Sequence, residues 1–302
     1  MKVFNHFCCL SLIVLCLSSF PCLSQAMPLN EEFQYYNPYS HLQYPNEIGL
    51  LDEKPWNPLL QAKAIKIKED SASEIIKKLS ALVFIIGGSE KHTTLEALDL
   101  SGSNITHEEL RDLIRFIQRV FPNIKELNLS HINIGEAGAI HLAGLSRLPK
   151  LKSLLLAQCN LGSTEVTYLT ELTQLESLDL FDNHIGDNGA IHLLHLTQLK
   201  MLDLTHNYIG DLGVWCLKEL KELRDLNLSV NQIGDEGASH LKELKELRSL
   251  SLMHNHIRDE GMTYLAELTQ LKRLVLVENN IGTESIDALK QTLVGCVILS
   301  DS

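Results

Sequence analysis

One pattern, written five times at a fixed interval, limits what this chain can fold into. It reads L-x-x-L-x-L-x-x-N-x-I and starts at Leu175, Leu199, Leu223, Leu247 and Leu271, so successive copies lie 24 residues apart. A fixed period of this size is typical of an array of small stacked units. We therefore expect one elongated repeat domain, although 302 residues would be enough for two domains.

Each unit has two parts with different hydrophobic periods. In the first part Leu178 and Leu180 alternate with polar neighbours, which predicts a strand with one buried face. In the second part Ala190, Leu193 and Leu196 recur every three residues, which predicts a short helix. Neither part can bury its apolar side alone, so the units must cover one another and form an α/β solenoid. Strands stack about 4.8 Å apart whereas helices need about 10 Å, so we expect the parallel strands on the concave face.

Two polar positions recur in the units, and both are interpreted as structural. An asparagine follows each strand, where its amide can satisfy backbone groups that leave the sheet. These residues are Asn183, Asn207, Asn231, Asn255 and Asn279. A good N-cap residue type directly precedes each predicted helix. These residues are Asp187, Asp211, Asp235, Asp259, Ser163 and Thr283.

The units before the regular ones are less alike. Residues 62–94 are predicted to be a degenerate capping unit, with a weak strand around Ile65 and a helix over 71–86. Three longer units then begin at Leu95, Ile124 and Leu151, and their asparagine positions hold Ser103, Ile132 and Cys159.

We expect the solenoid to span residues 95–299, with about eight repeats and the 24-residue period from 151 onward. A helix around 285–293 and an edge strand over 297–299 are predicted to close it, before the tail 300–302.

The first 61 residues differ from the repeats. Residues 1–26 resemble an export signal, with Lys2, an apolar run over 7–17 and a small-x-small site ending at Ala26. The run is too short to span a bilayer about 30 Å thick, so we expect cleavage after Ala26 and no stable membrane anchor. Residues 27–61 are rich in Pro and Tyr, which predicts an irregular leader. It could pack on the first repeats or serve as an accessory contact segment.

The number of cysteines and the net charge limit which bonds and partners this chain can have. Removal of the signal leaves three of the seven cysteines, Cys159, Cys216 and Cys296, which are predicted to be far apart and buried, with no disulfide or metal-ligand spacing. Without Lys2, 25 Lys and Arg face 38 Asp and Glu, a formal charge of −13. This balance disfavours nucleic acid and anionic lipid, and favours a protein partner with a basic surface.

The sequence pattern of the units resembles that of leucine-rich repeat proteins of the ribonuclease-inhibitor-like class. The extended form N-x-I-G-D-x-G-A-x-x-L is similar to repeat proteins of gram-negative bacteria, including host-directed effectors of intracellular pathogens, and the resemblance covers about 95–299. It implies protein–protein recognition through the concave face, without identifying the partner. The chain departs from such effectors in two ways. Residues 1–26 resemble a cleavable signal, which these effectors generally lack. The catalytic or adaptor domain of ubiquitin-ligase effectors is not recognisable here.

The chain shows no recognisable motif for catalysis. G-x-S-x-G, P-loop and H-E-x-x-H patterns are missing from the sequence. Histidines cluster after the predicted strands, at His131, His184, His206, His254 and His256. His206 and His254 are two units apart, or about 10 Å at the sheet spacing, which is too far for one metal ion. We therefore predict a non-enzymatic protein with no metal, cofactor or small-molecule substrate.

The residues of the concave face can be read from the pattern. Numbered from the first leucine of each unit, positions 5 and 7 flank the inner leucines and must point away from the core. The predicted protein-binding residues there are Asp99, Asn128, Leu155, Asp179, Phe181, Asp203, Thr205, Asn227, Met253, Val275 and Val277, with Arg273 beside them. Leu155 with Phe181, and Met253 with the two valines, are predicted to be exposed apolar clusters that flank an acidic stripe of Asp179 and Asp203. In the alternative, the closing strand covers Val275 and Val277.

These expectations favour a secreted or periplasmic, monomeric scaffold that binds another protein, as a bacterial host-interaction factor. The alternative is a structural, envelope-associated repeat module without a strong ligand site. Loss of a specific partner on mutation of the concave face would distinguish the two.

Overall fold

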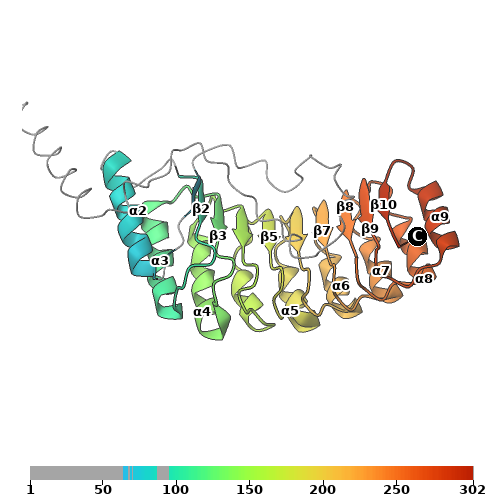
Figure 1. Cartoon of the computed structure of the whole chain (residues 1–302), viewed down its shortest axis with the longest axis horizontal. Coiled ribbons are helices and arrows are strands. Elements are labelled where there is room, and N and C mark those ends of the chain that lie inside the picture. Colours follow the sequence, from blue (N-terminus) through green and yellow to red (C-terminus); the bar gives the residue numbers. More distant parts are fainter. Residues whose placement is uncertain (1–63, 67–68, 70, 87–94, 302) are drawn as a thin grey trace, which may run out of the picture. The chain divides into compact units, whose positions relative to one another are not determined.

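The computed structural model describes residues 64–66, 69, 71–86 and 95–301, which all lie in one compact unit, Lys54–Ser302. The predicted export signal and the Pro- and Tyr-rich leader lie outside the described residues. Within the described part, ten strands form one parallel sheet whose order follows the chain (Figure 1). The strands are β1 (Ala64–Lys66), β2 (Ala97–Asp99), β3 (Glu126–Asn128), β4 (Ser153–Leu155), β5 (Ser177–Asp179), β6 (Met201–Asp203), β7 (Asp225–Asn227), β8 (Ser249–Ser251), β9 (Arg273–Val275) and β10 (Val297–Leu299).

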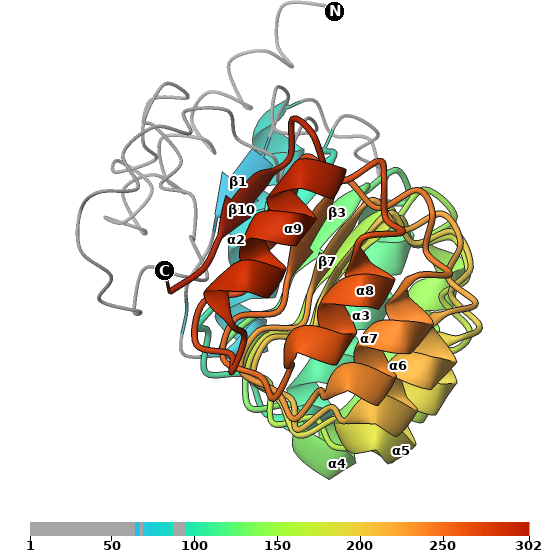
Figure 2. The ribbon, with the colours of Figure 1, turned by 90° about the vertical axis from the view of Figure 1, so that its right-hand side faces the viewer.

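Helices follow the strands and pack on one side of the sheet (Figure 2). The helices are α2 (Ala72–Ile86), α3 (His107–Val120), α4 (Gly135–Leu142), α5 (Gly186–Leu193), α6 (Asp211–Leu217), α7 (Asp235–Leu241), α8 (Asp259–Leu265) and α9 (Thr283–Thr292), with the 3-10 helices η2 (Ala143–Arg147) and η3 (Glu165–Leu169). The predicted α/β solenoid of parallel strands and short helices is therefore confirmed. The face lined by the strands is called the sheet face below.

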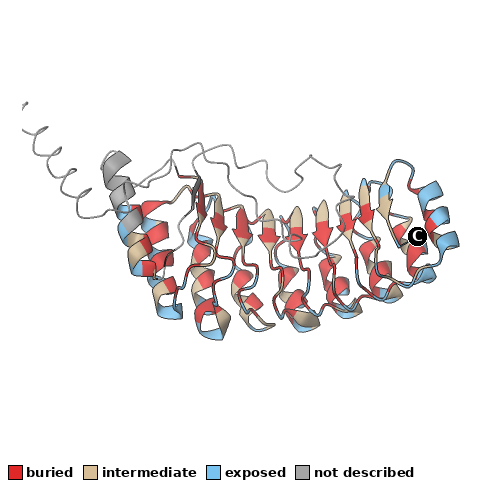
Figure 3. Cartoon of the chain, in the orientation of Figure 1, coloured by how far each residue is buried: buried red, intermediate tan, exposed pale blue. Residues whose placement is uncertain are grey.

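The inner leucines stack in register from strand to strand. Leu178 pairs with Leu154 on one side and with Leu202 on the other, and the same step recurs along the sheet. The position-4 leucines are at most 2 % exposed and form part of one continuous core (Figure 3). Burial of each such side chain is worth about 1.5–3 kcal/mol, and only neighbouring units supply the cover.

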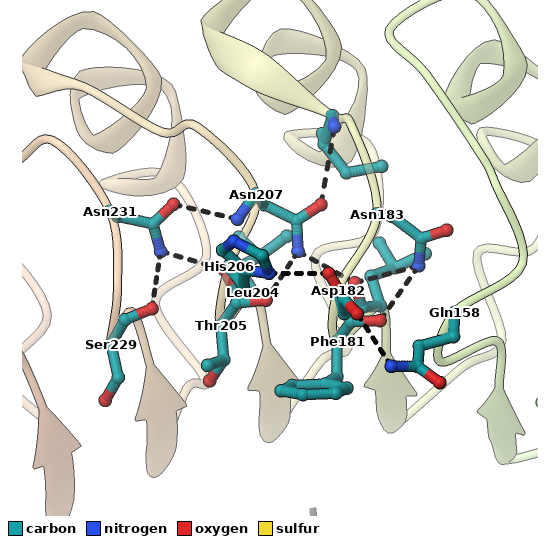
Figure 4. Close-up of polar contacts among 12 residues, drawn as sticks. Gln158, Phe181, Asp182, Asn183, Leu204, Thr205, His206, Asn207, Ser229 and Asn231 are labelled. Carbon is teal, nitrogen blue, oxygen red and sulfur yellow. Dashed lines mark hydrogen bonds and ion pairs between the residues drawn. The ribbon is translucent and has the colours of Figure 1, made fainter. Parts of the chain in front are cut away.

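The asparagines form a second, polar ladder inside the turns. The Nδ2 group of Asn207 donates to the carbonyl oxygens of Leu180 (2.8 Å) and Thr205 (3.0 Å), and its side chain is fully buried (Figure 4). The backbone N–H of Asn207 donates in turn to Oδ1 of Asn231, at 3.1 Å. Each amide thus joins two adjacent units, which confirms the predicted structural role.

The prediction that the acids cap their own helices is wrong. Asp211 is the first residue of α6, and its Oδ1 accepts hydrogen bonds from the N–H groups of Gly234 (2.7 Å) and Gly237 (2.9 Å) in the first turn of α7. Asp187, Asp235 and Asp259 reach the following helix in the same way. A glycine or an extended residue precedes α6 to α9, so the acid itself enters the helix and its side chain points forward along the stack.

Ser163 and Thr283 make no cap either. Glu165 accepts from the N–H of Gly162 at 2.8 Å at the start of η3, and α9 begins without a side-chain cap.

The forward reach of the acids also explains a recurring glycine. A Cβ on Gly237 would lie 2.5 Å from Oδ1 of Asp211 and 2.7 Å from Cγ2 of Ile233, so no larger residue fits.

The irregular units use a different side chain to bond the backbone in the turn after the strand. At the asparagine position of its unit, the thiol of Cys159 donates to the carbonyl oxygen of Leu129 at 3.2 Å. Burial raises the pKa of this thiol to about 12. Cys159 and Cys216 are buried as predicted, and the three described cysteines form no disulfide. The prediction is wrong for Cys296, which is partly exposed because it enters the edge strand β10.

Both ends of the array differ from its middle. At one end β1 pairs with β2, and α2 buries Ile75 and Leu79 beside α3, which begins with a capping box between Thr106 and Glu109. At the other end β10 pairs with β9, with Leu299 opposite Val275. The strand and helix predicted for each end are present.

Candidate functional site

The predicted contact residues at position 5 form one line across the sheet face. Strand register places Asp99, Asn128, Leu155, Asp179, Asp203, Asn227, Ser251 and Val275 on successive strands, each opposite the next. Asp179 and Asp203 are therefore direct neighbours, as the acidic stripe requires. The residues at position 7 follow in a second line at the exit of the strands.

The position-7 residues are less accessible than predicted. Phe181 is 3 % exposed and Met253 is 8 % exposed, so the prediction that both are exposed apolar groups is wrong. Adjacent strands of a sheet lie only about 4.8 Å apart. The Phe181 ring turns toward the neighbouring strand that carries Thr205 (Figure 4), so it lies along the sheet face. Thr205 is itself 1 % exposed, and its Oγ1 has no hydrogen-bond partner.

The acids and amides of position 5 hold the backbone at the strand exit. Asp179 Oδ1 accepts from the N–H of Phe181 at 2.8 Å, and Asp203 Oδ1 accepts from the N–H of Thr205 at 2.8 Å. Asp99, Asn128 and Asn227 do the same for the residue two places later. Asp203 is also buried and accepts from Nδ2 of Asn227 at 3.0 Å. These side chains therefore have a structural duty that the pattern alone did not reveal.

The two neighbouring acids titrate abnormally. Burial, and then the charge of Asp203, raise the pKa of Asp179 to about 7, although the Phe181 N–H bond opposes this shift. Burial likewise raises the pKa of Asp203. Two carboxylates on adjacent strands cannot both ionise without repulsion, and low solvation makes the repulsion worse.

Four of the predicted residues remain accessible, and their side chains do not accept a hydrogen bond from the backbone N–H two residues later. Leu155, Arg273, Val275 and Val277 are all half-buried. The closing strand β10 lies beside Val275 without covering it fully. The three apolar side chains of this group lie outside the continuous core.

A row of polar side chains at position 8 was not singled out as a site from the sequence. Asp182 accepts from Nε2 of Gln158 at 2.7 Å and lies 2.5 Å from Nδ1 of His206 (Figure 4). His254 and Glu278 form a similar pair at 2.6 Å. The position-8 residues from His131 to Glu278 have φ values between 49° and 60°, which is the left-handed region.

A second row, at position 2, was also missed. We call it the edge row; its members are Glu96, Lys125, Lys152, Glu176, Lys200, Arg224, Arg248 and Lys272. Glu176 bridges Lys152 (2.9 Å) and Lys200 (2.7 Å), which shows that side chains of adjacent units meet along this row. The sequence signal for this row is the charged residue that stands at position 2 of every unit.

The part of the chain that the structure describes offers neither a metal centre nor a membrane-spanning helix. No group of three or more His, Cys, Asp or Glu side chains there could hold a metal ion. None of the helices described is long and apolar enough to cross a membrane.

The geometry and the known families agree on the class of protein. A leucine-rich repeat model matches residues 149–209, 173–233 and 197–257, and a second leucine-rich repeat model matches residues 91–108. Together with the stacked parallel strands, these matches show that the fold is a leucine-rich repeat solenoid. The matched repeats support a protein-binding repeat scaffold.

Two solved structures are similar to parts of the chain. One is an internalin (inlF) of Listeria monocytogenes, which is 23% identical, with 69% of this chain and 81% of that chain covered and a TM-score of 0.42. Another is internalin C2 (inlC2) of the same organism, 21% identical, with 65% and 84% covered and a TM-score of 0.48. No curated protein matches the chain.

Proposed function

We propose that this protein is a non-enzymatic scaffold that binds another protein through its sheet face. The observation that carries the proposal is the group of half-buried apolar side chains at Leu155, Val275 and Val277, which join no core. Apolar groups that remain accessible on a polar sheet are what a contact surface needs. The acidic net charge favours a partner with a basic surface overall.

We also propose that the protein works after export, as a secreted or periplasmic bacterial host-interaction factor. The support is the signal-like segment 1–26 together with the resemblance of the repeat wording to bacterial effectors. N-terminal sequencing of the protein recovered outside the cytoplasm is expected to start at Met27. A chain that retains Met1 would contradict the proposal.

The array itself supplies substitutions that test the sheet face without damaging it. Leu155→Asn copies Asn128, Val275→Ser copies Ser251, and Val277→Ser copies Ser229, each from the same register of another unit. The triple variant is expected to keep its circular dichroism spectrum and to lose the main protein that the wild type labels in a proximity-labelling experiment on host cells.

A matched control lies on the helical side. Ile140 and Ile191 are exposed on α4 and α5, and the same register holds Thr167 in the intervening unit. The double variant Ile140→Thr/Ile191→Thr is expected to label the same partner as the wild type. If the sheet-face variant keeps that partner, or if neither protein labels a specific one, the sheet-face scaffold is refuted in favour of a structural module.

A further inference from the structure

The edge row has two ends with different charge patterns. Toward the N-terminus the row mixes acids with cations that pair, with Lys125 bonded to Glu96 at 2.9 Å and Glu176 bonded to both neighbouring lysines. Toward the C-terminus the row contains no acid. The cation end, as we call it, consists of Arg224, Arg248 and Lys272 on consecutive units, with Arg273 beside them at the start of β9.

The charges of the cation end are not compensated within the described residues. None of these four side chains forms an ion pair or a side-chain hydrogen bond with any residue that the structure describes, and Nε of Arg224 is buried without a hydrogen-bond partner. A buried guanidinium N–H without an acceptor costs about 1–3 kcal/mol. Three like charges at the spacing of adjacent strands, about 4.8 Å, also repel one another.

Asp225 is the carboxyl group nearest to the cation end in sequence, and one carboxylate cannot balance the four cations there. Burial raises the pKa of Asp225 to about 6, although Arg248 and Arg224 both lower it. It also forms no ion pair with either arginine. Carboxylates of a partner would pair with the accessible side chains of Arg248, Lys272 and Arg273 and relieve the repulsion between the cations.

We propose that the cation end of the edge row binds an extended acidic segment of a partner protein. The cation end fits such a segment, because from Arg224 to Lys272 it crosses two strand spacings, or about 10 Å. Four extended residues span about the same length, and acids at alternate positions present two carboxylates to the row. Arginine binds carboxylates through two parallel N–H groups, which favours this partner chemistry.

The surroundings favour a short acidic peptide over a long polyanion. The protein has a formal charge of −12, so a nucleic acid or sulfated polysaccharide running past the row would meet an acidic surface. The half-buried Met201 and Val275 also flank the row, and apolar peptide side chains can pack there. The substitutions that test this inference, at Arg248 and Lys290, leave unchanged the residues substituted to test the proposed function, so the two can fail separately.

The chain offers a substitution that converts one end of the row into the other. Arg248→Glu places an acid between Arg224 and Lys272, as Glu176 lies between Lys152 and Lys200. The variant is expected to be at least as stable as the wild type, because it creates pairs and removes repulsion. The control Lys290→Glu changes the net charge equally, on α9.

The probe is a fluorescent nine-residue peptide with Glu at alternate positions and Ser between them, followed by anisotropy at low salt. The wild type and Lys290→Glu are expected to bind it with similar affinity, and Arg248→Glu at least tenfold more weakly. A peptide with Gln in place of Glu is expected not to bind. Equal binding by Arg248→Glu, equal weakening by Lys290→Glu, or tighter binding of single-stranded DNA or heparin fragments than of the peptide would each overturn the proposal.

Discussion

The regular units from Leu175 onward and the irregular units before them build the same solenoid with different turn chemistry. In the regular units a buried asparagine uses both donors and its oxygen to join two turns, and an acid reaches forward to the next helix. In the unit that begins at Leu151 a thiol replaces the amide, and Glu165 caps locally. The comparison teaches that the stacked leucines are common to both kinds of unit, whereas the polar side chains that join the turns can vary.

The largest expected effect comes from breaking the amide ladder. Asn207→Ala leaves two carbonyl groups and an N–H group unsatisfied in a buried turn, so we expect a loss of about 3–5 kcal/mol in the free energy of unfolding. Cys159→Ala removes one weak thiol bond at the same position and should cost about 1 kcal/mol. Urea unfolding measures both, and equal losses would contradict the distinction between the two kinds of turn.

Removal of a forward-reaching acid should have a smaller effect. Asp211→Ala leaves the N–H groups of Gly234 and Gly237 without their acceptor, and we expect a loss of about 2 kcal/mol. Asp211→Asn keeps an oxygen acceptor and should recover most of the loss. Amide hydrogen exchange at the start of α7 should quicken in the alanine variant and not in the asparagine variant. Quickening confined to α6 would show that the acid acts on its own helix.

The paired acids predict a pH effect that the neutral position-5 residues lack. The folded pKa of Asp179 is raised to about 7 from an ordinary value of 3.8, so the fold favours the protonated form and loses stability as pH rises from about 4 to 7. Asp179→Asn keeps an acceptor for the Phe181 N–H and carries no charge. At pH 8 it should be more stable than the wild type by about 2 kcal/mol, and at pH 4 the difference should vanish. A constant difference in thermal unfolding across this range would argue against the assignment.

The smallest effect is expected where a regular unit carries an unfavourable residue. Val230 has a φ of 55°, a left-handed conformation that a β-branched residue adopts at a cost. Val230→Asn should therefore stabilise the protein by about 1 kcal/mol in urea unfolding. Asn in place of His206, which has nearly the same φ, serves as a control and should not stabilise, because the substitution removes the Asp182 pair. Destabilisation by Val230→Asn would mean that the valine packs usefully.

Much of the fold followed from the pattern, and less of the site did. The alternation at Leu178 and Leu180 and the 24-residue period determine which side chains face inward, so strands, helices and core could be predicted. The direction in which Asp211 points could not, because helix start positions depend on backbone angles that the acid itself does not set. The burial of Phe181 was missed because facing away from the core was equated with exposure.

The cation end of the edge row was missed for a different reason. Net charge was averaged over the chain, and an average of this kind hides a local arrangement of opposite sign. Arg224, Arg248 and Lys272 are far apart in sequence and become neighbours only when the repeats are aligned one above another. Aligning every position of the repeat, including those outside the hydrophobic pattern, is the signal that could have found them.

The forward reach of Asp187 and Asp211 has a consequence for how such a molecule can change length. Excision of residues 199–222 would bring Asp187 opposite Gly234 and Gly237, the groups that Asp211 now serves. The new junction would repeat the contacts of the old one, because adjacent regular units are joined by the same residue types at the same positions. Gene duplication or deletion in steps of one unit therefore preserves the contacts between units, and evolution can adjust the length of the sheet face without redesigning the core.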